Sequence, residues 1–226
     1  VAKGSGMIHP DLATLLCFLT TDAAVDIDFL RVALKKAVDI SFNMVSIDGD
    51  TSPNDMVLIM ASGLAGGGIS AGSELADAFQ QALDQVCVYL AKGIAGDGEG
   101  ATRLIEVTVS GAPNVAEARL AARAVVSSSV VKAAVHGSDP NWGRVMAAVG
   151  RSGVGVVESK VDLFIGDICL VKAGKPLPFS KRSAVRILKG SEVPITLNLN
   201  LGSSKATAWG CDLSEEYVTI NSQYTT

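Results

Sequence analysis

The sequence has 226 residues, with 19 lysines and arginines against 23 aspartates and glutamates, and a formal net charge of −4. This balance argues against a basic nucleic-acid-binding surface as the main function. Hydrophobic residues make up 48% and charged residues 19% of the chain, which excludes a disordered protein and allows a large core. At about 150 residues per domain, we expect one large domain or two small ones.

Cysteine and histidine usage predicts a chain without disulfides or a metal centre. The cysteines lie far apart, mostly in apolar runs, and none forms a CxxC motif, so we expect buried free thiols. They are Cys17, Cys87, Cys169 and Cys211. The two histidines, His9 and His136, are too few for a zinc site without cysteine pairs. No apolar stretch reaches the roughly 18 residues of a membrane helix, so we expect a cytoplasmic protein with no membrane or nucleic-acid partner.

The first third of the chain predicts two strands on either side of a helix. A nearly unbroken apolar run over 13–21 is typical of a strand buried on both faces. A helix is expected to begin at Asp26, because apolar residues then recur at spacings of three and four. A second strand is expected over 55–61. The glycine-rich segment 63–68 is interpreted as a flexible surface loop.

The middle of the chain predicts further helices around one strand. Apolar residues in register predict a helix over 73–91, and a partly alternating pattern predicts a strand over 102–109. Asn114 followed by Glu117 resembles a capping box that begins a helix running into the 120s. A short helix is expected over 142–149, after a turn.

The last third is expected to consist of β hairpins, with a half-exposed strand over the strictly alternating segment 196–201. Helices in the first two thirds and strands in the last indicate the α/β class in its mixed α+β form, with mixed sheets layered with helices. We expect a larger α/β part over about 14–155 and a smaller β-rich part over about 156–226.

Two candidate functional residues lie near the start of the chain. Lys3 stands in a glycine-rich turn, but the GxxxxGK[ST] motif of nucleotide P-loops is absent, so a loop entering a strand is the simpler interpretation. Thr14 is a candidate nucleophile if the bond before it is cut, because the freed α-amino group can act as its base. The unperturbed pKa of an α-amino group, about 8, suits that task. Spacing alone does not distinguish Thr14 from an ordinary threonine.

Two acidic segments each allow a plain and a functional interpretation. Segment 48–55 has many oxygen ligands but lacks the spacing of an EF-hand, so a turn capped by Asp and Asn is preferred over a calcium loop. Glu99 stands between the glycines of 96–100. Such glycines let a ligand approach the backbone and leave the carboxylate free to meet a cation. A plain turn fits this segment equally well.

Segment 137–144 combines turn residues with an aromatic ring and a guanidinium group. An ion pair of Arg144 with Asp139 that fixes the turn is preferred over a role in binding a ligand's carboxylate. His136 is interpreted as a structural hydrogen-bonding residue rather than a base. Ser138, His136 and Asp139 are not expected to form a Ser-His-Asp triad, because sequence neighbours rarely adopt that geometry.

Taken together, these segments resemble one family, the ornithine acetyltransferases, also called bifunctional glutamate N-acetyltransferases. The resemblance covers the whole chain. Separate blocks in the family's order are far more specific than any single loop. The blocks are 3–14, 20–23, 41–43, 48–52, 96–102, 138–144 and 221–226.

The resemblance implies a self-processing precursor with two subunits. The family's cleavage site corresponds to the bond between Ala13 and Thr14, so 1–13 would be the C-terminal tail of an α subunit and 14–226 the β subunit. It further implies an α2β2 heterotetramer with sheets shared between the subunits, and an oxyanion hole formed by a Thr-Gly pair of the upstream α subunit. Thr226 matches the usual terminus of the family.

The resemblance also implies the reaction and its residues. The Thr14 hydroxyl would take an acetyl group from N2-acetyl-L-ornithine and pass it to L-glutamate by a ping-pong route in arginine biosynthesis. Lys3 is expected to pair with an α-carboxylate, and Glu99 with the side-chain ammonium of ornithine. No cofactor is implied, and acetyl-CoA stays open as a further donor substrate. The substrate-binding positions are Lys3, Thr14, Glu99, Asn221 and Thr226.

Two other functions fit the same residues. A self-processing aminopeptidase or amidohydrolase would use Thr14 with water as the acceptor. A non-catalytic module that binds a small ligand would use the glycine-rich loops without a covalent step. Acetyl transfer to glutamate would indicate the acetyltransferase, and release of acetate would indicate the hydrolase. Neither reaction would occur in a binding module.

Overall fold

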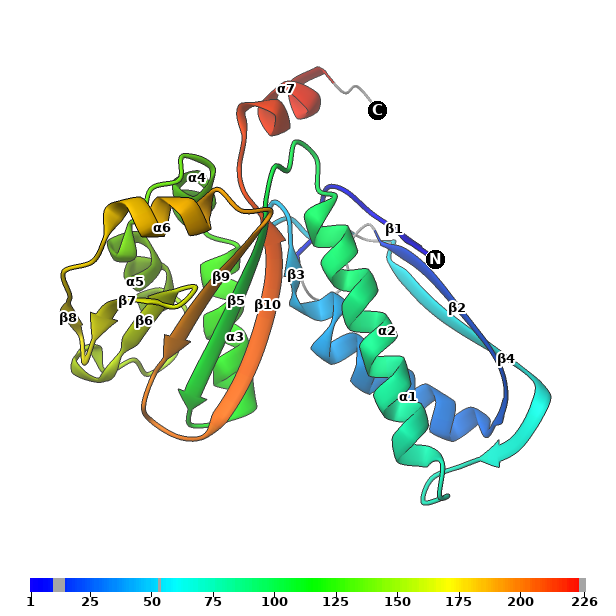
Figure 1. Cartoon of the computed structure of the whole chain (residues 1–226). Coiled ribbons are helices and arrows are strands. Elements are labelled where there is room, and N and C mark those ends of the chain that lie inside the picture. The colour runs from blue at the N-terminus through cyan, green and yellow to red at the C-terminus, as the bar shows by residue number, and fades with distance from the viewer. Residues whose placement is uncertain (10–14, 53, 224–226) are drawn as a thin grey trace.

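The computed structural model describes residues 1–9, 15–52 and 54–223. Figure 1 shows a small sheet, a pair of long helices, a larger sheet and a further group of helices, one after another across the molecule. The paired helices are α1 (Ile27–Ile40) and α2 (Ala76–Gly96), and α3 (Val115–Val126) covers the far face of the larger sheet. The other helices are α4 (Ser129–His136), α5 (Trp142–Gly150), α6 (Lys181–Leu188) and α7 (Glu215–Gln223), with 3-10 turns at Phe42–Met44 and Glu158–Lys160.

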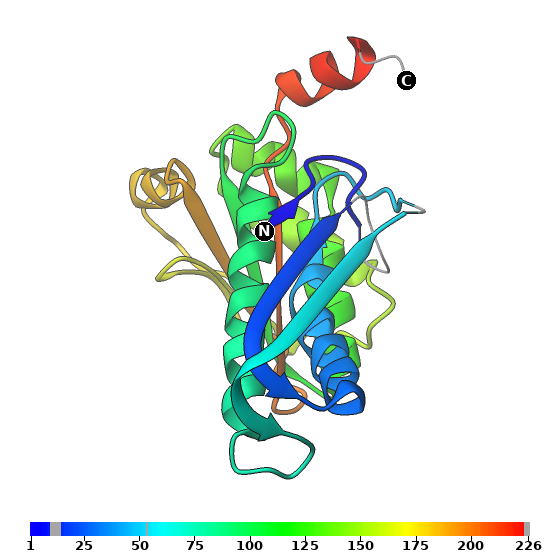
Figure 2. The ribbon, with the colours of Figure 1, turned by 90° about the vertical axis from the view of Figure 1, so that its right-hand side faces the viewer.

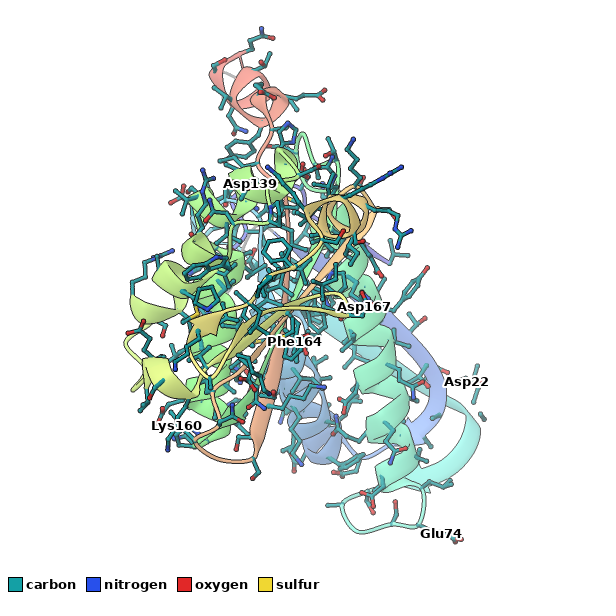
Figure 3. The ribbon with its side chains drawn as sticks, turned by 60° about the vertical axis from the view of Figure 1, so that its left-hand side comes forward. Asp22, Glu74, Asp139, Lys160, Phe164 and Asp167 are labelled. Carbon is teal, nitrogen blue, oxygen red and sulfur yellow. The ribbon has the colours of Figure 1, made fainter. Side chains whose placement is uncertain are left out.

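The smaller sheet has the order β1-β2-β4, in which β2 and β4 run parallel and α1 connects them. In Figure 2 these two long strands lie side by side in front of α1 and α2. They are β1 (Ala2–Lys3), β2 (Leu16–Val25) and β4 (Met56–Ile69). Figure 3 shows Asp22 and Glu74 on this side of the molecule and Lys160 on the opposite side.

The larger sheet has the order β3-β10-β5-β9-β6-β7-β8 and mixes parallel with antiparallel pairs. Its strands are β3 (Val45–Ser46), β5 (Leu104–Ala112), β6 (Asp162–Ile165), β7 (Ile168–Lys172), β8 (Lys175–Pro176), β9 (Glu192–Asn198) and β10 (Ser204–Cys211). Helix α2 packs on one face of β10 and β5 and α3 on the other. The predicted class, α/β with mixed sheets layered with helices, is confirmed.

Helix α1 begins where the sequence predicts. The Asp26 side chain caps it by accepting hydrogen bonds from the amides of Asp28 at 3.1 Å and Phe29 at 3.0 Å. These bonds satisfy two of the amides that a helix leaves unpaired at its start. The helix buries Leu30, Ala33 and Ala37 on one face, and small side chains on that face allow close packing against α2.

Strand β2 is not buried on both faces, so that part of the prediction is wrong. Cys17 and Leu19 are buried in the core, whereas Phe18 between them is 40% exposed. Its partner in the neighbouring strand, Leu58, is 38% exposed. Within the described residues this sheet is covered on one face only, because α1 and α2 both pack on the same side.

Segment 63–68 forms part of β4 instead of the predicted surface loop. Four of its glycines have positive φ, and the pairing of β2 with β4 shifts register between Thr21 and Ala23 and again before Val25. Register shifts of this kind bend a strand without ending it. Figure 1 shows the resulting bend near the end of β4.

The other helices and strands predicted in the first two thirds are confirmed with shifted ends. Helix α2 corresponds to the helix predicted over 73–91, and α5 corresponds to the helix predicted over 142–149. Strand β5 corresponds to the strand predicted over 102–109. The capping box before α3 is also confirmed. The Asn114 side chain accepts from the amide of Glu117 at 2.9 Å and donates to its carboxylate at 2.9 Å.

The last third contains helices that the sequence analysis missed. Strands β6 and β7 form an expected hairpin, but α6 and α7 also lie here, and the strand predicted over 196–201 is β9. Helix α6 buries only Ala184 and Leu188, and α7 buries none of its described residues. Helix α7 lacks the wide apolar face that marks a helix in a sequence, whereas α6 has an apolar face at Ala184, Ile187 and Leu188 but is only 8 residues long. The domain boundaries after residue 13 and near residue 155 stay predictions.

The four cysteines are free thiols, as predicted, and three of them are buried. Burial is the main cause that raises the pKa of Cys87 to about 12, so this thiol stays protonated and unreactive at neutral pH. Within the described ranges, the structure has no helix with the length and hydrophobicity needed to cross a membrane.

Removing the cap of α1 tests this part of the fold. We expect Asp26→Ala in the full-length protein to lower the free energy of unfolding by about 1 kcal/mol, because two helix amides lose their acceptor. Urea unfolding measures this difference. The control is Asp22→Ala, which removes an exposed carboxylate of β2 (Figure 3) and should change the free energy of unfolding by less than about 0.5 kcal/mol. Equal effects would contradict the assigned cap.

Candidate functional site

A cleft of about 930 Å³ lies between the segment around β1 and the end of α2. Lys3 and Glu99, two of the predicted binding residues, both line it. A second lysine of the cleft, Lys92, is held between Glu106 at 3.1 Å and Glu192 at 3.0 Å. Lys3 has no ion pair among the described residues, so its ammonium group is available to an anion in the cleft.

Glu99 is held through its side chain and its backbone by two distant parts of the chain. Its Oε2 accepts from the side-chain amide of Asn221 on α7 at 2.9 Å, and its backbone amide donates to the carbonyl of Ser5 at 2.8 Å. A Cβ on Gly6 would lie 2.7 Å from Oε2, so a larger residue at this position would displace the Glu99 carboxylate from the place it occupies. Lys3, Glu99 and Asn221 are therefore brought together at one site.

Gly100 lets the loop that carries Glu99 pack against the start of α7. It has a φ of +66°, and a Cβ there would lie 2.5 Å from the amide nitrogen of Tyr217. The Ser214 hydroxyl donates to the Gly100 carbonyl at 2.6 Å. The glycines beside Glu99 thus allow another part of the protein's own backbone to approach this loop closely. This role is more specific than the plain turn considered from the sequence.

The remaining predicted site residues lie outside the described ranges. They are Ala13, Thr14 and Thr226. The chain on either side of 10–14 is anchored, however. The buried Ile8 accepts at its carbonyl from the amide of Ile47 at 2.8 Å, and the amide of Leu15 donates to Asp55 at 2.6 Å.

Asp55 is a residue that the sequence analysis treated only as part of an acidic turn. Its Oδ1 accepts from Leu15, while its Oδ2 is buried and has no hydrogen-bond partner in the described structure. Burial raises the pKa of Asp55, and the hydrogen bond from Leu15 only partly offsets this. No spacing in the sequence marks this carboxylate, because its partner lies 40 residues away.

A sequence model of the ArgJ family matches residues 1–226. The chain belongs to the ArgJ family. It is 56% identical over 227 residues to the arginine biosynthesis bifunctional protein ArgJ of Symbiobacterium thermophilum and 53% identical over 226 residues to that of Dehalococcoides mccartyi, covering 100% of this chain and 56% of each relative. The chain thus spans about half the length of these relatives. The resemblance to ornithine acetyltransferases is confirmed.

A solved member of the ArgJ family has the same fold. The crystal structure of the arginine biosynthesis bifunctional protein ArgJ from Bacillus halodurans matches with a TM-score of 0.91 and 45% sequence identity. The match covers 92% of this chain and 99% of that chain. The layered mixed sheets described above are therefore an arrangement that this chain shares with the ArgJ family.

Asp212, directly after β10, ties the site of this ArgJ family chain to the larger sheet. Its carboxylate accepts from the Thr102 amide at 2.7 Å, the Thr102 hydroxyl at 2.5 Å and the Arg103 amide at 2.8 Å. It also bonds to His136 Nδ1 at 2.7 Å, and His136 Nε2 lies 3.2 Å from the Glu215 carboxylate. His136 is thus the structural hydrogen-bonding residue that was expected, and it forms no triad with its sequence neighbours.

The pKa of Asp212 reflects these partners. Burial alone would raise it, but the hydrogen bonds from Thr102, His136 and the backbone together hold it below the ordinary value of 3.8. The buried Lys132 lies close by and donates to the carbonyl and the sulfur of Cys211. Burial lowers the pKa of Lys132, and the negative charges near it oppose that shift. The sequence analysis missed both Asp212 and Lys132.

Arg144 does not pair with Asp139, so that prediction is wrong. Its guanidinium donates to the carbonyl of Val130 at 2.9 Å. Asp139, which Figure 3 labels, instead accepts from the Asn141 side chain at 3.1 Å. Asn141 also caps α5 by accepting from the amide of Arg144 at 3.3 Å. The side-chain amide of Asn141 therefore holds this turn, in place of the predicted ion pair between Arg144 and Asp139.

The described residues of the acidic segment 48–55 form capped turns, the interpretation that was preferred over a calcium loop. Oδ1 of Asp48 accepts from the amide of Asp50 at 3.2 Å, and the Ser52 hydroxyl donates to Asn54 at 2.6 Å. Among the residues that the structure describes, no cluster of three or more His, Cys, Asp and Glu side chains is placed to hold a metal ion.

Acid unfolding tests the Asp212 network. Because the pKa of Asp212 is lower in the folded than in the unfolded protein, its stabilising effect is present above the unfolded value of 3.8 and is lost as the pH falls through the folded value. We expect Asp212→Asn to lower the free energy of unfolding by about 2 kcal/mol at pH 7. Its free energy of unfolding should also depend less on pH below about 4 than that of the wild type.

The control for this experiment is Asp167→Asn. Asp167 is an exposed carboxylate in the turn between β6 and β7 (Figure 3). Urea unfolding at a series of pH values gives the free energies of all three proteins. A wild-type pH dependence that Asp212→Asn leaves unchanged would show that other carboxylates account for the acid sensitivity.

Proposed function

We propose that the protein containing this chain transfers an acetyl group from N2-acetyl-L-ornithine to L-glutamate in arginine biosynthesis. Its relatives are named arginine biosynthesis bifunctional proteins. The observation that carries the proposal is that Lys3 and Glu99 line one cleft while Asn221 donates a hydrogen bond to the Glu99 carboxylate. These residues come from the first strand, the loop after α2 and the last helix, so no local structural need accounts for their convergence.

The charges of the cleft fit the proposed donor. N2-acetyl-L-ornithine carries an α-carboxylate and a side-chain ammonium, while its acetylated nitrogen is neutral. Lys3 supplies a cation for the carboxylate, and Glu99 supplies an anion for the ammonium. The bond from Asn221 orients the Glu99 carboxylate and leaves it with further acceptor sites for a ligand.

The covalent step is assigned to Thr14, after cleavage of the bond from Ala13 to Thr14. Attack of the Thr14 hydroxyl on the Ala13 carbonyl would form an ester and break the amide bond, which frees the α-amine of Thr14, and hydrolysis of the ester would then free the hydroxyl. That amine would take the hydroxyl proton as the acetyl group moves to Thr14 and give it to the departing amine of ornithine, and the α-amine of glutamate would then accept the acetyl group from the Thr14 ester. The reaction needs no cofactor, because Thr14 carries the acetyl group. Acetyl-CoA would enter only as an alternative donor.

The partner in this proposal is the upstream part of the same precursor, in an α2β2 assembly. The open face of β2 and β4 supports it, because Phe18, Leu58 and Met60 are 38% to 48% exposed there. A contiguous apolar surface of this kind usually has a protein partner. The curated relatives are nearly twice as long as this chain, so each has a second half available to cover such a face.

Substitution of the nucleophile tests the reaction. We expect Thr14→Ala to block both self-cleavage and acetyl transfer, with a loss of at least about 1,000-fold in rate. Mass spectrometry of the intact protein after brief exposure to N2-acetyl-L-ornithine measures both, because the wild type should yield a subunit that begins at Thr14 and carries one acetyl group. Thr20→Ala, an exposed threonine of β2, is the matched control.

The same experiment separates the other functions. Normal self-cleavage in the Thr14→Ala variant would show that another residue is the nucleophile. An acetylated wild type that releases acetate but does not acetylate glutamate would be an amidohydrolase. A wild type that binds the donor without ever becoming acetylated would be a binding module.

A second substitution tests the pairing of Glu99 with the ornithine ammonium. Glu99→Gln keeps the size of the side chain and an oxygen for Asn221 but removes the charge. We expect kcat/KM for N2-acetyl-L-ornithine to fall by about 10- to 100-fold, the effect of one charge-assisted hydrogen bond. Half-reaction kinetics should show a smaller loss for glutamate. Equal losses for donor and acceptor would contradict the pairing.

A further inference from the structure

The Asp48 carboxylate receives four hydrogen bonds and so has its acceptor sites filled. Oδ2 accepts from the amide of Met7 at 2.6 Å and the hydroxyl of Tyr217 at 3.2 Å. Oδ1 accepts from the amides of Ile8 at 3.1 Å and Asp50 at 3.2 Å. A carboxylate with two donors on each oxygen has little capacity left for a metal or a substrate, so its partners define its role.

Three of these donors lie on the cleft-lining segment that carries Lys3 and on α7, whose Asn221 binds the Glu99 carboxylate. Met7 and Ile8 belong to the segment that begins with Lys3, and Tyr217 belongs to α7, four residues before Asn221. Asn221 donates to the Tyr217 carbonyl at 3.0 Å as well as to Glu99. One half-buried carboxylate therefore connects the lysine-bearing segment with the helix that orients Glu99.

The segment before the proposed cleavage site needs such a connection. After cleavage between Ala13 and Thr14, Lys3 is no longer covalently joined to the chain that carries Glu99. Strand β1 pairs with β2 over two residues, flanked by two hydrogen bonds between Val1 and Phe18, which is a short contact by the usual length of strands. Beyond β1, the carbonyls of Ser5 and Ile8 accept from the amides of Glu99 and Ile47. Met7 also has a φ of +53°, a conformation that methionine rarely adopts and that outside contacts must hold.

We propose that Asp48 is a positioning residue that keeps the cleaved tail, and with it Lys3, in register with Glu99 and Asn221. The proposal rests on the proposed function for the cleavage and the substrate. Two successive amides that point at one carboxylate form an anion-binding pair, and bonds of this kind to an ionised acceptor are stronger than those between neutral groups. Asp48 acts through Lys3 and Asn221, and it does not touch the substrate.

The surroundings of Asp48 fit this role. Burial raises the pKa of Tyr217 to about 12, and the Asp48 charge and hydrogen bond contribute further to that shift, so the phenol stays a donor to the carboxylate. The buried Lys132 ammonium interacts electrostatically with both Asp48 and Asp212. It thereby balances part of the negative charge beneath the cleft.

The test uses the full-length protein with Asp48→Asn and Tyr217→Phe. Asparagine keeps one acceptor oxygen and replaces the other with a donor, so at least two of the four bonds are lost. We expect Asp48→Asn to raise the KM for N2-acetyl-L-ornithine about 10-fold with kcat changed less than about twofold, because Lys3 and Glu99 bind substrate and transition state alike. Tyr217→Phe should raise the KM about threefold, and it should add less than about twofold in the Asp48→Asn background.

Hydrogen exchange supplies a readout that does not depend on activity. The amides of Met7 and Ile8 should exchange at least about 10-fold faster in Asp48→Asn than in the wild type. Asp50→Asn is the matched control, because it removes an exposed carboxylate from the same turn while its backbone amide still donates to Asp48. It should leave both the exchange and the KM unchanged.

Several results would overturn the proposal. They are unchanged exchange at Met7 and Ile8 in Asp48→Asn, or faster exchange with an unchanged KM, or additive effects of the two substitutions. If Asp48→Asn does not fold, Tyr217→Phe decides, and an unchanged KM in that variant rejects the connection. A wild type that transfers no acetyl group would reject the proposed function, and the exchange data alone would then support or reject the tail connection.

Discussion

The Asp212 carboxylate, placed where β10 ends, is the constraint on which the site depends. The carboxylate forms hydrogen bonds with the two amides just before β5, with the Thr102 hydroxyl and with the His136 ring. The ends of two neighbouring central strands and the end of α4 are thereby joined at one buried anion. Its low pKa keeps it charged, and a buried charge is tolerable only while all its partners are present. Because Asp212 must keep these partners, its position is fixed, and with it the start of the segment that leads into α7.

The cleft is built on that fixed edge by contacts between backbone and small residues. The loop with Glu99 lies against the start of α7 because Gly100 has no side chain, and Ser214 holds it there. The tail with Lys3 is joined to Glu99 by the bond from the Glu99 amide to the Ser5 carbonyl, and Gly6 leaves the Glu99 carboxylate in its place. Gly6 and Gly100 thus allow these chain segments to lie closer together than larger residues at the same positions would permit.

The elements that were predicted correctly are those with local causes. Helices α1 and α3 begin at Asp26 and Asn114, whose side chains cap amides two or three residues later. The errors have non-local causes. β2 has one open face because both long helices pack on the other side, and α7 buries nothing, so its sequence carries no periodic apolar signal. Arg144 takes a carbonyl of α4 as its partner instead of the nearby Asp139, because tertiary packing outweighs sequence proximity.

The sequence alone predicted the fold class, because capping and periodicity are encoded in neighbouring positions. Its short motifs also predicted the family, and that resemblance pointed to Lys3 and Glu99, which line the cleft. Only the tertiary structure decided which groups hold those residues in place. The bond of Asp212 to Thr102 joins positions 110 apart, and that of Asp48 to Tyr217 joins positions 169 apart. No spacing rule reaches across such separations, since such pairs meet only when the sheets and helices have packed.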